Sequence, residues 1–180
     1  NRPLRPEDIM ILVRKRGDLA SLIVARLYAE GVPVAGVDRL RLNAPLAVQD
    51  LLAAARFALQ PGDDLNLAAL LVSPLIGWSQ DDLLARAIPR PGALWPHLRS
   101  RSDIGPTLDA LGDLLATADY TTPYRFFEQI LSGPLQGRRR LLGRLGEEAR
   151  DPIEELLSAA LAFEGQANPS LQRFLDWFDR

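Results

Sequence analysis

The residue with the clearest chemical potential is Arg14, which directly follows the apolar run Ile9 to Val13. A continuous apolar run of this length is typical of a strand that is buried on both faces of a parallel sheet. Arg14 is therefore expected at the C-terminal end of that strand, the edge where open α/β sheets bind ligands. An arginine there can stabilise the charge that develops on a phosphate during its transfer. The alternative is a surface charge that merely flanks the strand.

A second group of basic residues lies in one predicted helix: Arg138, Arg139, Arg140 and Arg144. Arg140 and Arg144 are four residues apart and share a face, whereas the other two fan away from it. Such a cluster can contact nucleic-acid phosphates, and its binding would be sensitive to salt. A solvated helix face, partly neutralised by the acidic residues at 147, 148 and 151, explains the pattern equally well.

Several kinds of active site are excluded by residues that the sequence lacks. There is no cysteine, one histidine (His97) and one lysine (Lys15). Disulfides, thiolate zinc sites and histidine metal clusters are therefore ruled out. A P-loop needs a glycine-rich turn that ends in Gly-Lys-Ser/Thr, and no glycine turn precedes Lys15. We expect no ATP hydrolysis by this chain alone, and we expect His97 to be a loop or surface residue.

Other candidate groups have plainer explanations. Four pairs of adjacent carboxylates could suggest two-metal chemistry: Asp63-Asp64, Asp81-Asp82, Glu147-Glu148 and Glu154-Glu155. Each pair lies in or near a predicted first helical turn, where carboxylates interact favourably with the helix dipole. We therefore predict no metal site. Trp78 and Trp95 fall in predicted loops and could stack on bases, whereas Trp177 belongs to the apolar face of the last helix.

Composition places the chain among globular proteins, with 47% hydrophobic and 24% charged residues in 180. The net charge is +3 over residues 1–60 and −5 over residues 61–180. Attraction to phosphate is therefore expected from the first third or from local clusters. The sequence shows neither a secretion signal nor an apolar run of membrane-spanning length, so we expect no membrane association. The lack of cysteine fits a protein of the reducing cytoplasm.

The elements that must position these residues fall into two groups. Residues 9–13 and 32–37 read as strands on either side of a helix over 19–30, which Asp18 caps and Gly31 ends. Such a strand–helix–strand unit belongs to a larger sheet, because two strands alone are marginally stable. Apolar periodicity and capping residues then predict helices over 45–59, 65–72, 79–87, 103–118, 123–132, 135–145, 151–163 and 169–178. Residues 89–96 hold three prolines and are predicted to form a loop.

The predicted fold class is therefore mainly α: a bundle-like helical subdomain over residues 46–180, with a small α/β remnant over residues 1–45. The segment Asp8 to Arg14 resembles the fourth conserved motif of UvrD/Rep-type superfamily 1 DNA helicases. Further segments resemble the same family in the same order, over residues 7–85: Gly31-Val32-Pro33, Val48 to Leu52, Asp63-Asp64, Leu70-Leu71 and Ser73 to Gly77. The sequence from Pro74 to Ser79 is most similar to that of the AddA/RecB helicase–nuclease branch.

This resemblance implies a role for each part of the chain. Residues 1–45 would belong to the second motor domain and residues 46–180 to the helical subdomain inserted in it, which contacts duplex DNA or partners. Arg14 would be an arginine finger that meets the ATP γ-phosphate, with ATP and Mg held by the remaining motor domains of the same polypeptide. The implied partners are DNA and an AddB-like subunit, in double-strand-break repair and recombination. The alternative is a self-contained helical protein-interaction module without nucleotide chemistry.

Overall fold

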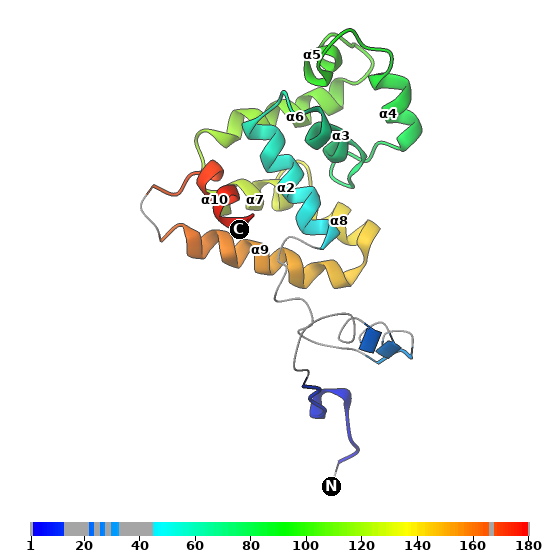
Figure 1. Cartoon of the computed structure of the whole chain (residues 1–180), viewed down its shortest axis with the longest axis vertical. Coiled ribbons are helices and arrows are strands. Elements are labelled where there is room, and N and C mark those ends of the chain that lie inside the picture. The colour runs from blue at the N-terminus through cyan, green and yellow to red at the C-terminus, as the bar shows by residue number, and fades with distance from the viewer. Residues whose placement is uncertain are drawn as a thin grey trace. The chain divides into compact units, whose positions relative to one another are not determined.

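The computed structural model describes residues 2–12, 22–23, 26–27, 30–32, 45–165 and 168–179. The chain divides into two compact units, residues 1–41 and 42–180; the sequence places the boundary between residues 45 and 46. Within the described ranges all regular secondary structure is helical, which confirms the mainly α fold class (Figure 1). In those same ranges, no helix is both long and apolar enough to cross a bilayer.

The first unit begins with a short 3₁₀ turn, η1 (Pro6–Asp8). Asp8 closes this turn by accepting the Arg5 backbone N–H at 3.0 Å and by pairing with Arg2 at 2.5 Å. The strand expected over 9–13 is not formed over residues 9–12, whose side chains are exposed. A strand is stable only where a neighbour accepts its hydrogen bonds and covers its apolar faces. The remainder of both predicted strands lies outside the described residues, apart from Val32, which is not in a strand.

Within the helix predicted over 19–30, residues 22–23 and 26–27 are helical, and Glu30 lies in a turn. Gly31 follows with φ +71°, and the Val32 N–H donates to the Leu27 carbonyl at 2.9 Å. This bond spans the last turn and identifies a Schellman-type end, which needs a left-handed residue. The prediction that Gly31 ends this helix is confirmed.

The second unit is built from nine α-helices and one 3₁₀ turn over the described residues. They are α2 (Leu46–Leu59), α3 (Asp64–Val72), α4 (Gln80–Ala87), α5 (Leu94–Arg99), α6 (Gly105–Ala118), α7 (Pro123–Ser132), α8 (Gly137–Leu145), η2 (Glu147–Ala149), α9 (Arg150–Phe163) and α10 (Leu171–Phe178). Apart from α5, each helix corresponds to a predicted one, with its ends shifted by two residues or fewer.

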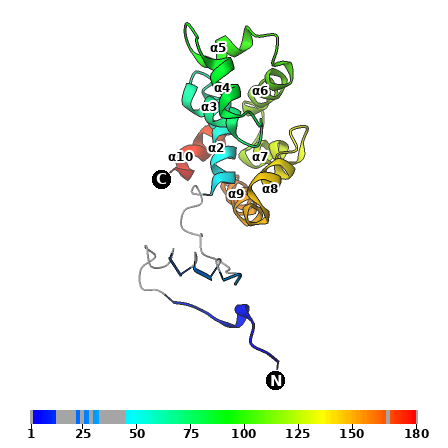
Figure 2. The ribbon, with the colours of Figure 1, turned by 90° about the vertical axis from the view of Figure 1, so that its right-hand side faces the viewer.

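Helix α2 lies at the centre of this unit. It packs against α3, α6, α7, α8, α9 and α10, and Figure 2 shows these helices around it. The sequence pattern predicts an apolar stripe on one side of α2, yet alanines outside that stripe, such as Ala47, Ala54 and Ala58, are also buried. Small side chains let several neighbouring helices approach α2 closely, which explains why it is covered on almost every side.

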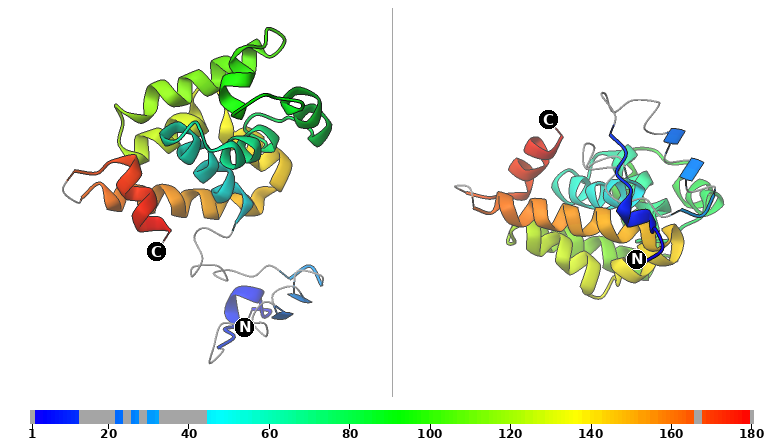
Figure 3. Two further views of the ribbon diagram at one scale, coloured as in Figure 1. Left: turned by 45° about the horizontal axis from the view of Figure 1, so that its top comes forward. Right: turned by 90° about the horizontal axis from the view of Figure 1, so that it is seen from below.

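Aromatic side chains hold α10 to the rest of the unit. The Phe174 ring of α10 lies 5.7 Å from Phe127 of α7 and 5.5 Å from Phe163 of α9, both in edge-on contact. Figure 3 shows α10 beside the C-terminal end of α9. Trp177 packs on Phe163 at 5.4 Å but keeps 42% of its surface exposed. The assignment of Trp177 to the apolar face is therefore right, although its ring is only partly covered.

Local capping signals predict several helix starts correctly. Asp63 caps α3 by accepting from the Leu65 and Asn66 N–H groups at 3.0 and 3.1 Å. Ser79 and Asp82 form a reciprocal capping box at the start of α4, with both backbone bonds at 3.0 Å. These two acidic pairs therefore serve helix starts, as their positions indicate.

The loop predicted over residues 89–96 is partly wrong, because α5 begins at Leu94 and contains Pro96 in its first turn. A proline is tolerated there because first-turn N–H groups have no intrahelical partner. The Leu94 N–H instead donates to Asp64 of α3 at 2.8 Å, and Arg90 pairs with the same carboxylate at 2.8 Å. These two contacts hold the pKa of Asp64 below its usual range.

Candidate functional site

The structure describes only one of the two groups of predicted site residues. Arg14 lies outside the described residues, so its position stays a prediction. The four arginines of the predicted basic cluster are all described, and all lie on α8. Their surroundings decide whether they act as one site.

The side chains of the four arginines point to different neighbours. Arg138 pairs with Glu154 of α9. Arg140 donates to the backbone carbonyl of Leu75 at 2.6 Å. Arg139 reaches the Gln136 side chain at 3.5 Å, and both Arg139 and Arg144 are exposed. The structure therefore separates Arg138, which is neutralised, from the other three.

Helix α8 is fixed firmly at its N-terminal end. A Cβ added to Gly137 would lie 2.7 Å from the Ile130 carbonyl oxygen and 3.0 Å from a Leu75 methyl carbon. This close approach to α7 and to the turn after α3 explains why a glycine begins the helix. The preceding residue, Gln136, adopts the left-handed region at φ 48°. Leu141 is fully buried one turn later. The direction in which α8 presents its arginines is therefore set by packing.

An open depression lies between the end of α7 and one side of α8. Its lining residues are Leu131, Ser132, Gln136, Arg138, Arg139, Leu142 and Arg150. Arg138 is paired with Glu154, and Arg150 is paired with Glu147 at 2.7 Å. Arg139 is the only lining arginine without a carboxylate partner among the described residues. The depression is therefore only weakly positive, and it holds no group suited to acid–base chemistry.

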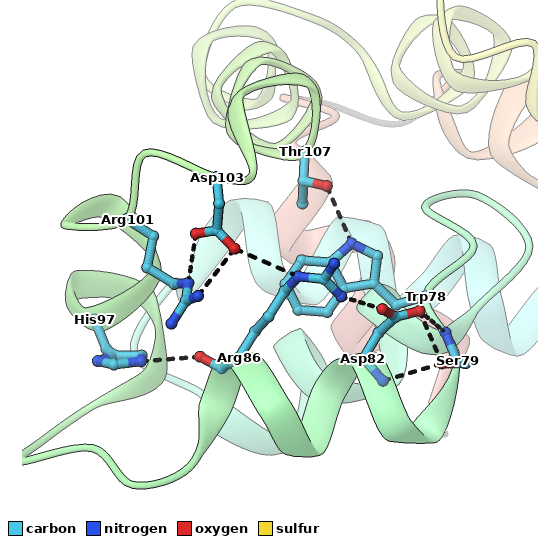
Figure 4. Close-up of polar contacts among 8 residues, drawn as sticks. All are labelled: Trp78, Ser79, Asp82, Arg86, His97, Arg101, Asp103 and Thr107. Atoms are coloured by element: carbon cyan, nitrogen blue, oxygen red, sulfur yellow. Dashed lines mark hydrogen bonds and ion pairs between the residues drawn. The ribbon is translucent and has the colours of Figure 1, made fainter.

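A second polar cluster surrounds Arg86 of α4 (Figure 4). The Arg86 guanidinium lies 5.2 Å above the Trp78 ring and pairs with Asp82 and, at 3.7 Å, with Asp103. The bond from Arg86, followed by those from Ser79, lowers the pKa of Asp82 to about 2. The Trp78 indole N–H donates to Thr107 of α6 at 3.1 Å. Each polar group in this cluster has a partner, so the cluster joins α4 to α6.

His97 and Trp95 are part of the same packing. His97 Nε2 lies 2.9 Å from the Arg86 carbonyl oxygen (Figure 4). The Trp95 ring meets Phe57 of α2 edge-on at 5.4 Å. Both side chains lie on α5 and are half-buried, so the expected loop or surface position of His97 is corrected. Arg86 covers one face of the Trp78 ring, so base stacking on that face would require Arg86 to move away.

Asp50 of α2 is a feature that the residue pattern does not reveal. Burial raises the pKa of Asp50 to about 6. No hydrogen bond or ion pair joins this carboxylate to another described residue. An acid inside an apolar helix normally faces water, and only the packing of other helices around α2 changes that. A half-buried, unpaired carboxylate alone defines no reaction.

Metal binding finds no support within the described ranges, where no three histidine, cysteine, aspartate or glutamate side chains gather in a way that could hold an ion. Comparisons with known proteins add no assignment: no protein-family model matches the sequence, and no curated protein matches it.

Proposed function

We propose that this chain is part of a bacterial, cytoplasmic ATP-dependent DNA helicase of the UvrD/Rep type, closest to the AddA/RecB helicase–nuclease branch. The observation that carries this proposal is the series of helicase-like segments between Asp8 and Gly77, which occur in the family's order. A single short segment of this kind has little weight, whereas a chance match is much rarer for six segments in the family's order. The proposed role is in double-strand-break repair and recombination.

Two glycines in this series support the alignment through their backbone conformations. Gly31 and Gly77 have φ angles of +71° and +86°. Side-chain-bearing residues rarely adopt such angles, so a glycine is needed at both places. Gly77 also closes the turn that starts at the buried Ser73, donating its N–H to the Ser73 carbonyl at 2.7 Å. The family-like residues therefore coincide with positions where the fold requires their type.

In this proposal Arg14 acts as an arginine finger toward ATP bound by other parts of the polypeptide. The guanidinium group of arginine is planar and permanently charged, and its N–H donors match the geometry of phosphate oxygens. It would neutralise charge that develops on the γ-phosphate, while the P-loop and Mg come from the remaining motor domains. Residues 46–180 would face DNA or an AddB-like subunit.

The test is Arg14→Ala in the full-length protein, with Arg16→Ala as a control that removes the same charge two residues away. Loss of an arginine finger lowers turnover by about 10³-fold or more. We expect that loss for Arg14→Ala, with nucleotide binding largely retained, and near-normal turnover for Arg16→Ala. The 180-residue chain alone should show no ATPase. Unchanged turnover in Arg14→Ala would rule out the finger.

A second candidate is a self-contained helical protein-interaction module without nucleotide chemistry. It is favoured by the separate core of residues 42–180, which forms a compact unit of its own. This candidate predicts that the coding sequence around these residues contains no Gly-Lys-Thr/Ser loop. The helicase proposal predicts such a loop upstream and further motor motifs downstream.

A further inference from the structure

Positive charge without a carboxylate partner is concentrated on α8. Six arginines in residues 45–165 and 168–179 belong to ion pairs: Arg56–Asp179, Arg86–Asp82, Arg90–Asp64, Arg101–Asp103, Arg138–Glu154 and Arg150–Glu147. By contrast, Arg139, Arg140 and Arg144 make no ion pair with any described residue. Helix α8 also contains no acidic residue. Its surface is thus positive within a chain whose net charge is negative.

These three arginines lie on one side of the helix. Successive residues of an α-helix are rotated by about 100°, which places Arg139, Arg140, Gly143 and Arg144 within one arc of about 140°. All four residues are exposed, whereas Gly137 and Leu141 are buried. We name the four exposed residues the α8 face. The bond from Arg140 to the Leu75 carbonyl anchors one edge of this face.

Gly143 leaves the middle of the α8 face open. A glycine inside a helix costs about 1 kcal/mol relative to alanine. Packing does not demand it here, because a Cβ added at Gly143 would meet no atom within 4 Å. With no side chain between Arg139 and Arg144, a flat or convex partner can approach the helix backbone closely.

We infer that the α8 face binds the phosphodiester backbone of a nucleic acid. This inference rests on the proposed function, which supplies DNA as the partner. Guanidinium groups pair with phosphate oxygens through two parallel hydrogen bonds, and three of them flank the open position. The face offers no hydrogen-bonding side chain other than arginine. These guanidinium groups are attracted to phosphates whatever the adjoining bases are, so we expect binding that is independent of base sequence and driven by counterion release.

The experiment measures binding of the full 180-residue chain to a mixed-sequence DNA duplex, and to one of its single strands, over a salt series. Two double variants are compared, each of which removes two positive charges. Arg139→Gln/Arg144→Gln changes the α8 face. Arg99→Gln/Arg125→Gln changes exposed arginines of α5 and α7 that also make no ion pair with a described residue.

We expect the α8 double variant to reduce the slope of log K against log salt by about 2, because each phosphate contact contributes about 0.9. At about 0.1 M salt this corresponds to a loss of affinity of tenfold or more. The α5/α7 double variant should keep most of the slope. Equal behaviour of the two variants would overturn the inference, as would undetectable or salt-independent binding by the unchanged chain. A duplex preference and a single-strand preference would each support it and would distinguish the two nucleic acids.

A second pair of variants tests the open centre of the face. Gly143→Gln adds a neutral side chain where the added Cβ has free space, and Gly112→Gln of α6 is the control, because its Cβ also meets nothing within 4 Å. We expect weaker DNA binding only from Gly143→Gln, with unchanged helical circular dichroism in both. Normal binding by Gly143→Gln would contradict close approach of the DNA backbone. Polyglutamate serves as a second probe, because it imitates an acidic protein. If the α8 double variant lost polyglutamate binding and kept DNA binding, the partner would instead be an acidic protein.

Failure of this inference and failure of the proposed function are separable. Normal DNA binding by the α8 double variant, together with lost ATPase in full-length Arg14→Ala, removes only the α8 assignment. Unchanged ATPase in Arg14→Ala removes the finger role, whatever the DNA-binding result.

Discussion

The Arg140 guanidinium donates to the backbone carbonyl of Leu75 across 2.6 Å and so joins α8 to the turn between α3 and α4. Leu75 is itself buried, and one of its methyl carbons defines the space beside Gly137. The same turn contains the helicase-like segment Ser73 to Gly77. A residue first noted for its charge therefore also has a structural role.

Replacing Arg140 should destabilise the second unit. Arg140→Ala leaves the Leu75 carbonyl without this donor, and a hydrogen bond to a charged group contributes about 1.5–3 kcal/mol. Since the side chain is partly exposed, we expect a loss of about 1 kcal/mol in the free energy of unfolding. Urea denaturation measures it. Arg144→Ala, on the same face without such a bond, should change stability little, and equal losses would contradict the bond's role.

Asp64 should matter to α5 as well as to α3. Asp64→Ala removes the acceptor of the Leu94 N–H and the partner of Arg90, and loss of a helix-capping acceptor costs about 1 kcal/mol. The folded pKa of Asp64 is depressed, so its contribution is present above the unfolded value near 3.9 and is lost as pH falls. Urea denaturation at neutral and acid pH measures both effects. Asp109→Ala, at an exposed position within α6, is the control.

Asp50 should produce the opposite pH dependence. Burial raises its pKa to about 6, so between about pH 4 and 6 the folded chain binds more protons than the unfolded chain. The contribution of Asp50 to the free energy of unfolding therefore falls as pH rises through that range. Asp50→Asn should abolish this dependence and be more stable than the unchanged chain at pH 7. The free energy of unfolding of both proteins is measured from pH 4 to 7. If the two values differed by the same amount at every pH, the expected effect of Asp50 would be disproved.

Two glycines of α8 should respond to alanine in opposite directions. Gly143→Ala adds a methyl group in free space and should stabilise the chain by up to about 1 kcal/mol. Gly137→Ala forces a methyl group to 2.7 Å from the Ile130 carbonyl oxygen, so it should destabilise the chain. Thermal unfolding of both variants measures the difference in sign. Similar shifts in melting temperature would mean that α8 does not pack as described.

Signals confined to a few neighbouring residues predict much of this fold. Asp63, and Ser79 with Asp82, mark helix starts correctly, because capping depends on residues three positions apart or fewer. Pro123 marks the start of α7 in another way, because its fixed φ and missing N–H suit the first helical position. Gly31 and Gly133 likewise mark helix ends. These elements form for reasons that the local sequence contains.

Contacts between distant segments account for what the sequence does not predict. The start of α5 depends on Asp64, thirty positions before Leu94, and local proline content there favours a loop. The burial of Asp50 depends on the helices that surround α2. The sequence correctly places the four arginines of the basic cluster on one helix. It does not indicate that Arg138 pairs with Glu154 or that Arg140 donates to Leu75, because both partners lie outside residues 138–144.

The position of α2 has a consequence for synthesis on the ribosome. Its partners include α9 and α10, and Arg56 pairs with Asp179 at 2.8 Å, a contact between residues 123 positions apart. As α2 emerges first, the part of its surface that α9 and α10 cover remains open to water until α10 has also left the exit tunnel. Native packing around α2 is therefore completed only after most of this unit has been translated. During that interval a chaperone that binds apolar helices would find α2 accessible.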